Sequence, residues 1–171
     1  QALSVISQLD FSKFGFFKKI IPSNNPALTV TQFNTIPAGI KLFITDLKNL
    51  NLDGTQHLTA AQFNTVPLQA KASIEVLDLT IEDVRGFDLS GFTNLKTLTL
   101  WRVRNLTAMQ FNTIPLQAKA SIESLDLTGV DVKDFDFSGF TNLKNLNLES
   151  AQGLTANQFN TIPVETKASI E

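Results

Sequence analysis

The side chains that could carry acid–base chemistry are aspartates that recur at a fixed spacing. Three of them return at the same places in a second copy of one sequence block, as the pairs Asp78/Asp126, Asp83/Asp131 and Asp88/Asp136. Paired carboxylates are common equipment for general acid and base catalysis. Here their placement follows an internal duplication, which explains it without a paired acid and base. We therefore expect no enzymatic activity and no catalytic residue.

Other reactive groups are scarce. The chain has no cysteine, which excludes thiol nucleophiles, disulfides and thiolate metal sites, and its one histidine, His57, is expected in a surface turn. The eight glycines stand singly, so no glycine-rich phosphate loop is present. The sequence predicts neither a metal nor a cofactor.

One group of side chains has the composition of a recognition surface. Trp101 is the only tryptophan, and Arg102 and Arg104 follow it. Val76 and Ile81 belong to the preceding strand motif, and we expect them beside Trp101. Tryptophan and arginine next to apolar neighbours are typical of a binding hot spot. The competing interpretation is that Trp101 folds back to shield Val76 or Ile81.

These residues lie in a block that the chain repeats. The copies span 58–105 and 106–153, a third begins at 154, and a partial copy starts at Leu28. Self-similarity at a fixed period is the signature of a repeat architecture.

Each copy opens with a helix signal. A threonine precedes a glutamine by three positions, which is a capping box. It predicts a short helix, 108–113 in the second copy, that ends before Pro115. A phenylalanine in each helix is expected to face the interior, as listed here: Phe33, Phe63, Phe111 and Phe159.

The strand signal is Ile/Leu-x-x-Leu-x-Leu. Its copies start at 47, 74, 95, 122, 143 and 170, so the intervals alternate between 27 (74 − 47) and 21 (95 − 74). Alternation within each run predicts a strand with one buried face. Each block is therefore a long unit with a helix and a short unit with a Phe-x-x-x-x-Phe turn.

This motif and spacing resemble the leucine-rich repeat family. The resemblance implies an α/β solenoid with a parallel β-sheet on the concave face and short helices and turns on the convex face. The family's turn asparagine is replaced in every unit, so those backbone groups need other partners. The replacing residues are Thr55, Glu82, Val103, Val130 and Ala151.

We expect two segments. Residues 1–27 do not fit the repeat and are predicted to cap its open end, with Phe11, Phe14, Phe16 and Phe17 buried. Residues 28–171 form the solenoid. A new strand motif opens at Ile170, which indicates either a fragment of a longer protein or subunits stacked head to tail.

The two full blocks differ at 15 of 48 positions. Most outward strand positions change, including Trp101 to Glu149 and Ile81 to Gly129. Surface drift alone would produce this. However, four residues expected on the convex surface return unchanged, which favours the concave face as the working surface: Gln69, Lys71, Ser73 and Glu75.

We therefore predict a non-enzymatic module that binds a protein partner, or a glycan, on its concave face. The alternative is a structural protein that assembles head to tail into a fibre or surface layer. Net charge is −2 and no basic stripe is present, so nucleic acid is not an expected partner. No apolar run approaches the roughly 20 residues that a membrane span requires. The initial Gln and the resemblance favour an extracellular or cell-surface location. The expected contact residues are Trp101, Arg102, Arg104, Thr99, Asp78, Ile81, Val76, Asp126, Asn147 and Glu149.

Overall fold

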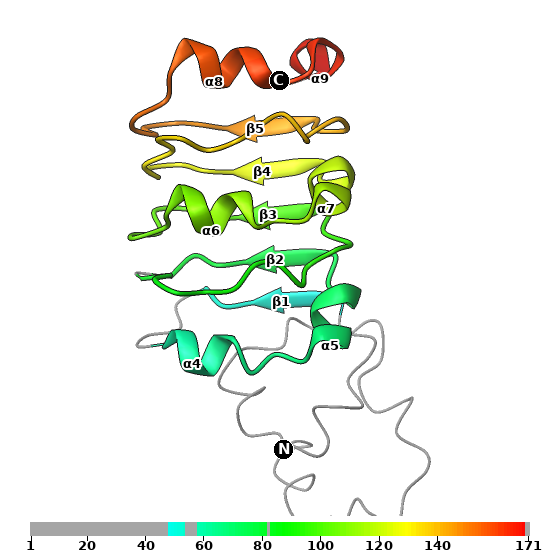
Figure 1. Cartoon of the computed structure of the whole chain (residues 1–171), viewed down its shortest axis with the longest axis vertical. Coiled ribbons are helices and arrows are strands. Elements are labelled where there is room, and N and C mark those ends of the chain that lie inside the picture. The colour runs from blue at the N-terminus through cyan, green and yellow to red at the C-terminus, as the bar shows by residue number, and fades with distance from the viewer. Residues whose placement is uncertain (1–47, 54–57, 82, 170–171) are drawn as a thin grey trace, which may run out of the picture.

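The protein is an α/β chain with a five-stranded parallel sheet. The computed structural model describes residues 48–53, 58–81 and 83–169. The strands pair in chain order and all in parallel, so they stack along the long axis of the molecule (Figure 1). They are β1 (Asn49–Asn51), β2 (Val76–Asp78), β3 (Thr97–Thr99), β4 (Ser124–Asp126) and β5 (Asn145–Asn147). The parallel strands predicted from the leucine motif are confirmed.

The register places equivalent residues of each unit side by side. The central leucine of each strand pairs with the next, as Leu77 does with Leu98 and Leu98 with Leu125. These three leucines are at most 1% exposed, while the residues on either side of them are more exposed. One face of the sheet is therefore built into the core, and the other carries side chains to the solvent.

The first helix of each block is set by its capping box. In α6 (Ala108–Asn112), the Thr107 hydroxyl accepts from the Gln110 backbone N–H, and the Gln110 side chain accepts from the Thr107 N–H. The same pair of bonds starts α4 (Ala60–Phe63) and α8 (Ala156–Thr161). Two backbone donors that a helix end leaves free are thus satisfied. These helices confirm the sequence prediction.

The structure adds a second helix in each block, which the sequence did not predict. These helices are α5 (Leu68–Ser73), α7 (Leu116–Ser121) and α9 (Val164–Ser169). Each follows the proline that was expected only to stop the first helix. In α7 the Pro115 carbonyl accepts from the Lys119 N–H at 2.9 Å. A proline just before good helix formers can start a helix as well as end one, because it needs no hydrogen-bond partner for its nitrogen.

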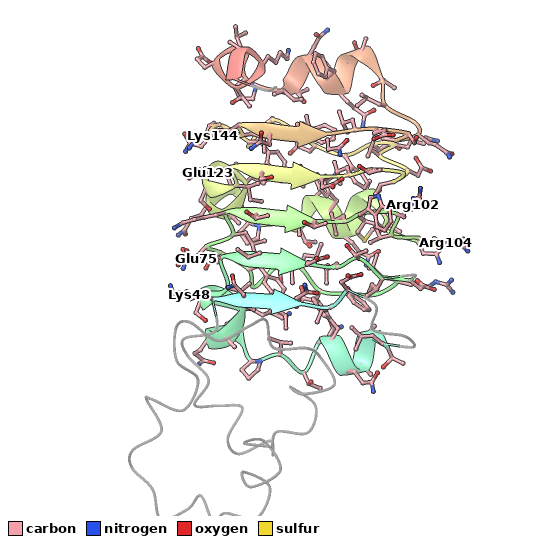
Figure 2. All side chains as sticks on the ribbon, turned by 180° about the vertical axis from the view of Figure 1, so that it is seen from behind. Lys48, Glu75, Arg102, Arg104, Glu123 and Lys144 are labelled. Carbon is pink, nitrogen blue, oxygen red and sulfur yellow. The ribbon has the colours of Figure 1, made fainter. Side chains whose placement is uncertain are left out.

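All these helices lie on the same side of the sheet, and no described element covers the other side (Figures 1 and 2). Between helices and sheet, phenylalanines fill the core. The ring of Phe111 stacks on that of Phe135 with centroids 4.2 Å apart, and Phe63 stacks on Phe87 at 4.3 Å. The equivalent Phe159 is 41% exposed, so the prediction that it is buried is wrong. No described unit follows this last pair of helices to cover it.

Two lysines are buried in this core. Lys71 and Lys119 are each 3% exposed, which corrects the expectation that Lys71 lies on the surface. The Lys119 ammonium donates to the carbonyl and the carboxylate of Asp136, at 2.9 and 3.1 Å, and lies 5.8 Å from the Phe111 ring centre. Lys71 makes the same contacts with Asp88. A buried ammonium needs this compensation, since an unpaired charge in an apolar core is costly.

These contacts make stability sensitive to acid. Hydrogen bonds from Ser90 and Ser138, together with the buried lysines, lower the pKa of Asp88 and of Asp136 to about 2. A carboxyl whose pKa is lower in the folded state stabilises the fold above its unfolded pKa, and that contribution disappears as pH falls through the folded value. We therefore expect the free energy of unfolding to fall between pH 4 and pH 2. Urea titrations at several pH values measure it.

The matched variant for this prediction is Asp136→Asn, which keeps an acceptor for the Ser138 N–H but cannot ionise. Its unfolding free energy should depend less on pH in that window. An unchanged pH dependence would contradict the role given to this carboxylate.

Several expectations fall outside the described residues. These are the cap at 1–27, the first part of the solenoid at 28–47, Thr55, His57, Glu82 and Ile170. Within the described ranges, no helix is long and apolar enough to cross a bilayer.

Candidate functional site

The amino ends of the strands carry a ladder of alternating charges. The residue preceding each strand is Lys48, Glu75, Lys96, Glu123 and Lys144 in turn. Glu75 pairs with Lys48 at 2.6 Å and with Lys96 at 3.0 Å, and Glu123 pairs with Lys144 at 2.8 Å. Hydrogen bonds from these lysines lower the pKa of Glu75 and of Glu123. In this ladder, which Figure 2 shows along one edge, both glutamates pair with lysines of neighbouring units.

The open face of the sheet carries two rows of polar side chains. One row is Asn51, Asp78, Thr99, Asp126 and Asn147, each paired by register with the next. Thr99 therefore lies between two carboxylates, and Asn147 lies beyond Asp126. In the other row, Val76 pairs with Thr97 and is 36% exposed. The two rows thus contain five of the ten residues predicted for the site: Val76, Asp78, Thr99, Asp126 and Asn147.

The carboxylates of this row are held by the turns that follow their strands. The Asp78 Oδ1 accepts from the Thr80 N–H at 2.9 Å and from its hydroxyl at 2.6 Å. Asp126 Oδ1 accepts from the Thr128 N–H at 2.9 Å. Asn147 does the same for Glu149 at 3.0 Å. These bonds, which use one oxygen of each side chain, stabilise the turns that follow the strands.

Trp101 and Arg102 end this face at the carboxyl side of β3. Trp101 is 40% exposed, and the Arg102 guanidinium lies 4.6 Å from its ring centre, within cation–π range. Arg102 has a φ of 56°, in the left-handed region. For a side chain without special need that conformation costs about 1–2 kcal/mol. The turn therefore holds an arginine where glycine would be easier.

The neighbouring turn makes room for this arginine. Gly129 follows β4 and also has a left-handed backbone, with a φ of 70°. A Cβ added there would lie 3.2 Å from the Arg102 Cγ, closer than ordinary contact. The Arg102 N–H donates to the Thr128 carbonyl at 2.7 Å. The change of Ile81 to Gly129 between the blocks therefore accompanies the presence of Arg102.

Arg104 lies on the same edge. It forms an isolated parallel bridge with Asp83, and its carbonyl accepts from the Val84 N–H at 3.2 Å. Figure 2 shows Arg102 and Arg104 at the edge of the sheet opposite the charge ladder. Glu149, the residue equivalent to Trp101 in the next block, is also exposed.

Ile81 does not belong to this surface. It is 7% exposed and contributes to the core, so its prediction as a contact residue is wrong. Val130, which follows Gly129, the counterpart of Ile81, is 1% exposed. Ile81 follows a sharp turn in which its N–H donates to the Leu79 carbonyl at 2.6 Å. Alternation places Ile81 on the same face as Leu77 and Leu79, and the turn keeps it in the core.

Three of the four residues that return unchanged between the blocks have structural roles. Lys71 is buried on Asp88, and Glu75 is fixed between two lysines of the charge ladder. Ser121, the counterpart of Ser73, donates to the Leu95 and Ala118 carbonyls. Gln69 is exposed. Contrary to the sequence interpretation, their constancy does not single out the open face.

One polar atom beside this site was not anticipated. Thr128 is 8% exposed, and its hydroxyl has no hydrogen-bond partner among the described residues, whereas the equivalent Thr80 hydroxyl bonds Asp78. Sequence comparison of the blocks could not find it, since Thr80 and Thr128 are identical. No group of three or more metal-ligating side chains occurs in the part of the chain that the structure describes. The side chains of the open face can form stacking contacts, hydrogen bonds and ion pairs.

Comparison with known protein families, with curated proteins and with solved structures finds no match. The function must therefore follow from this surface alone.

Proposed function

We propose that the chain is a leucine-rich repeat solenoid that acts as a non-enzymatic recognition module, with the open sheet face as its concave binding surface. The motif spacing and the in-register parallel sheet support the family. The resemblance also favours an extracellular or cell-surface location. The binding role is carried by one observation: Trp101 is 40% exposed, and the Arg102 guanidinium lies 4.6 Å from its ring centre.

The surface fits a protein partner with an apolar anchor and mixed charge around it. Trp101 offers a flat ring, Val76 a smaller apolar patch, and Thr99 lies between the carboxylates of Asp78 and Asp126. An aromatic and arginine centre with a polar rim is the arrangement in which a few residues supply most of the binding free energy.

Replacing Trp101 by alanine tests this proposal. We expect partner affinity to fall by at least about 30-fold, the change that corresponds to a hot-spot loss of about 2 kcal/mol. The immobilised chain captures candidates from the surface or secreted fraction of its source, and calorimetry then compares the wild type with Trp101→Ala and Arg102→Ala. Met109→Ala is the control, because Met109 is 81% exposed on α6, on the helical side.

Equal affinity of Trp101→Ala and Met109→Ala for a captured protein would remove the sheet face as the binding surface. A glycan array probed with the same proteins separates a carbohydrate ligand, whose binding would depend on Trp101 without any protein partner.

A second candidate function is assembly through the layer formed by α8 and α9. Phe159 is 41% exposed there, whereas Phe63 and Phe111 in the equivalent layers are at most 1% exposed. An apolar layer of this kind accepts a further repeat unit, as in a head-to-tail fibre or surface layer.

A further inference from the structure

The two helices of each full block form a layer, α4 with α5 and α6 with α7, which we call the inner layers. One short segment of chain covers each inner layer. Over α4 and α5 this segment is Phe87–Phe92, and over α6 and α7 it is Phe135–Phe140. Their sequences are FDLSGF and FDFSGF. In both, the first and last rings contact the helix phenylalanine beneath, so the structure shows twice what such a layer binds.

Hydrogen bonds and an ion pair also hold these segments on the helices. The Asp136 N–H donates to the Asn112 Oδ1 at 2.8 Å, and the Asn112 side chain donates to the Asp134 carbonyl at 3.3 Å. The Asp136 carboxylate receives the Lys119 ammonium at 3.1 Å. The receiving set in a layer is therefore a phenylalanine, the asparagine after it and a lysine of the second helix.

The α8–α9 layer carries the same receiving set. Phe159, Asn160 and Lys167 are the counterparts, one repeat block later, of Phe111, Asn112 and Lys119. The Lys167 ammonium lies 5.2 Å from the Phe159 ring centre and donates to the Asn160 carbonyl at 3.3 Å. No described segment covers this layer, and it stands at the far end of the molecule from β1 (Figure 1).

The sequence holds one more segment of the covering type. Leu9–Phe14 reads LDFSKF, which repeats the aspartate, phenylalanine, serine and final phenylalanine of FDFSGF. Its spacing also agrees, because the interval from Phe14 to Leu28 (28 − 14) equals that from Phe92 to Leu106 (106 − 92). The segment therefore has the position of a short repeat unit as well as its residues.

Leu9–Phe14 differs from FDFSGF at a position that would contact the residues by which the α8–α9 layer differs from the α6–α7 layer. Lys13 replaces the glycine, Gly139 in the second block. A Cβ at Gly139 would lie 2.8 Å from the Leu116 Cδ1, so an inner layer rejects a side chain there. In α9 that leucine is Val164, which has no δ carbon. The other tight neighbours at Gly139 are the Cβ and Cδ of Lys119, the counterpart of Lys167, each 3.0 Å from the added Cβ, so a side chain there also requires this lysine to move by a small amount.

The charge of the α8–α9 layer also differs from that of the inner layers, in a way that suits Lys13. The residue after Val164 is Glu165, where the inner layers have Gln69 and Gln117. Glu165 is exposed and directly follows Val164, the counterpart of the leucine nearest to Gly139. The smaller side chain of Val164 and the negative charge of Glu165 are thus both complementary to Lys13.

We infer that Leu9–Phe14 of a second copy of this chain docks onto the α8–α9 layer, with Asp10 on Lys167, Phe14 on Phe159 and Lys13 beside Val164 and Glu165. This rests on the second proposed function and specifies its contacts. Because the two surfaces lie in different parts of one chain, the contact is heterologous and propagates head to tail.

Sedimentation velocity of the full chain over a concentration series is the first measurement. We expect the mean mass to rise with concentration. Lys13→Glu or Glu165→Lys alone should weaken association about tenfold, since like charges facing each other in an interface repel. The double exchange, Lys13→Glu with Glu165→Lys, should restore it. Gln117→Lys, the same change on an inner layer, is the control and should leave association unchanged.

A size exchange gives an independent check. Val164→Leu restores the inner-layer leucine and should block association, and adding Lys13→Gly should recover it. Association that ignores all these variants overturns the inference while leaving assembly itself standing. A wild-type chain that stays monomeric at every concentration, whether because its own N-terminal segment covers the layer or because nothing does, overturns both the inference and assembly.

Discussion

Replacing Phe111 by alanine should lower the free energy of unfolding by about 3–5 kcal/mol, the usual cost of removing a buried aromatic ring. Phe111 is fully buried, and its ring contacts those of Phe135, Phe137 and Phe140 at centroid distances of 4.2, 5.8 and 5.9 Å. The surrounding rings belong to the segment Phe135–Phe140, which hydrogen bonds to Asn112 and Lys119 hold in place. They have little freedom to collapse into the space left behind.

The chain supplies its own control in Phe159, the same residue of the next copy. Phe159→Ala should cost about 1 kcal/mol or less in dilute solution, because surface changes rarely cost more. Urea unfolding followed by circular dichroism measures both, with the fluorescence of the single tryptophan as a second probe. If Phe111→Ala and Phe159→Ala lower the free energy of unfolding equally, the difference in burial between the two phenylalanines has no effect on stability.

Replacing Lys119 by alanine should cost about 3 kcal/mol, a large effect for a lysine. The charge-assisted bonds to Asp136 contribute about 1.5–3 kcal/mol. The position over two rings, 5.8 Å from Phe111 and 5.7 Å from Phe140, adds about 0.5–2 kcal/mol. Asp136 is half exposed and returns to water when the lysine is removed, which keeps the loss below the sum of these terms.

Lys144→Ala is the matched control, because the Lys144 side chain is 63% exposed although it pairs with Glu123 at 2.8 Å. Surface pairs contribute about 0–1 kcal/mol. Lys119→Met separates the two contributions within the buried site, since it keeps the stem and removes the charge. If Lys119→Ala and Lys144→Ala destabilise the protein equally, the buried lysine has no special role in the core.

Repetition made the strands and the first helices predictable. The leucine motif identified each strand and its buried face, and the Thr-x-x-Gln pattern identified α4, α6 and α8. The proline after each of these helices was ambiguous, because proline both stops one helix and precedes another. Local sequence alone therefore missed α5, α7 and α9.

Burial of polar side chains was the harder problem. Nothing in the sequence around Lys71 indicates an interior position, because its partner Asp88 is distant in the sequence and only the fold brings them together. Ile81 was assigned to the open face because it differs between the blocks, although alternation from Leu77 and Leu79 places it on the buried face. At the site, Trp101 and Arg102 were identified from composition, whereas the left-handed turn and its neighbour Gly129 required coordinates.

The ladder of lysines and glutamates has a bearing on how nearly identical repeats avoid assembling wrongly. A strand that paired with the next strand but one during folding would meet the same leucine positions. Burial of apolar surface would therefore discriminate little against the wrong pairing. The wrong pairing would, however, bring Lys48 beside Lys96, or Glu75 beside Glu123, where correct neighbours have opposite signs. The alternating charges therefore disfavour any pairing that omits one strand. A pairing that omits two strands would again place opposite charges side by side.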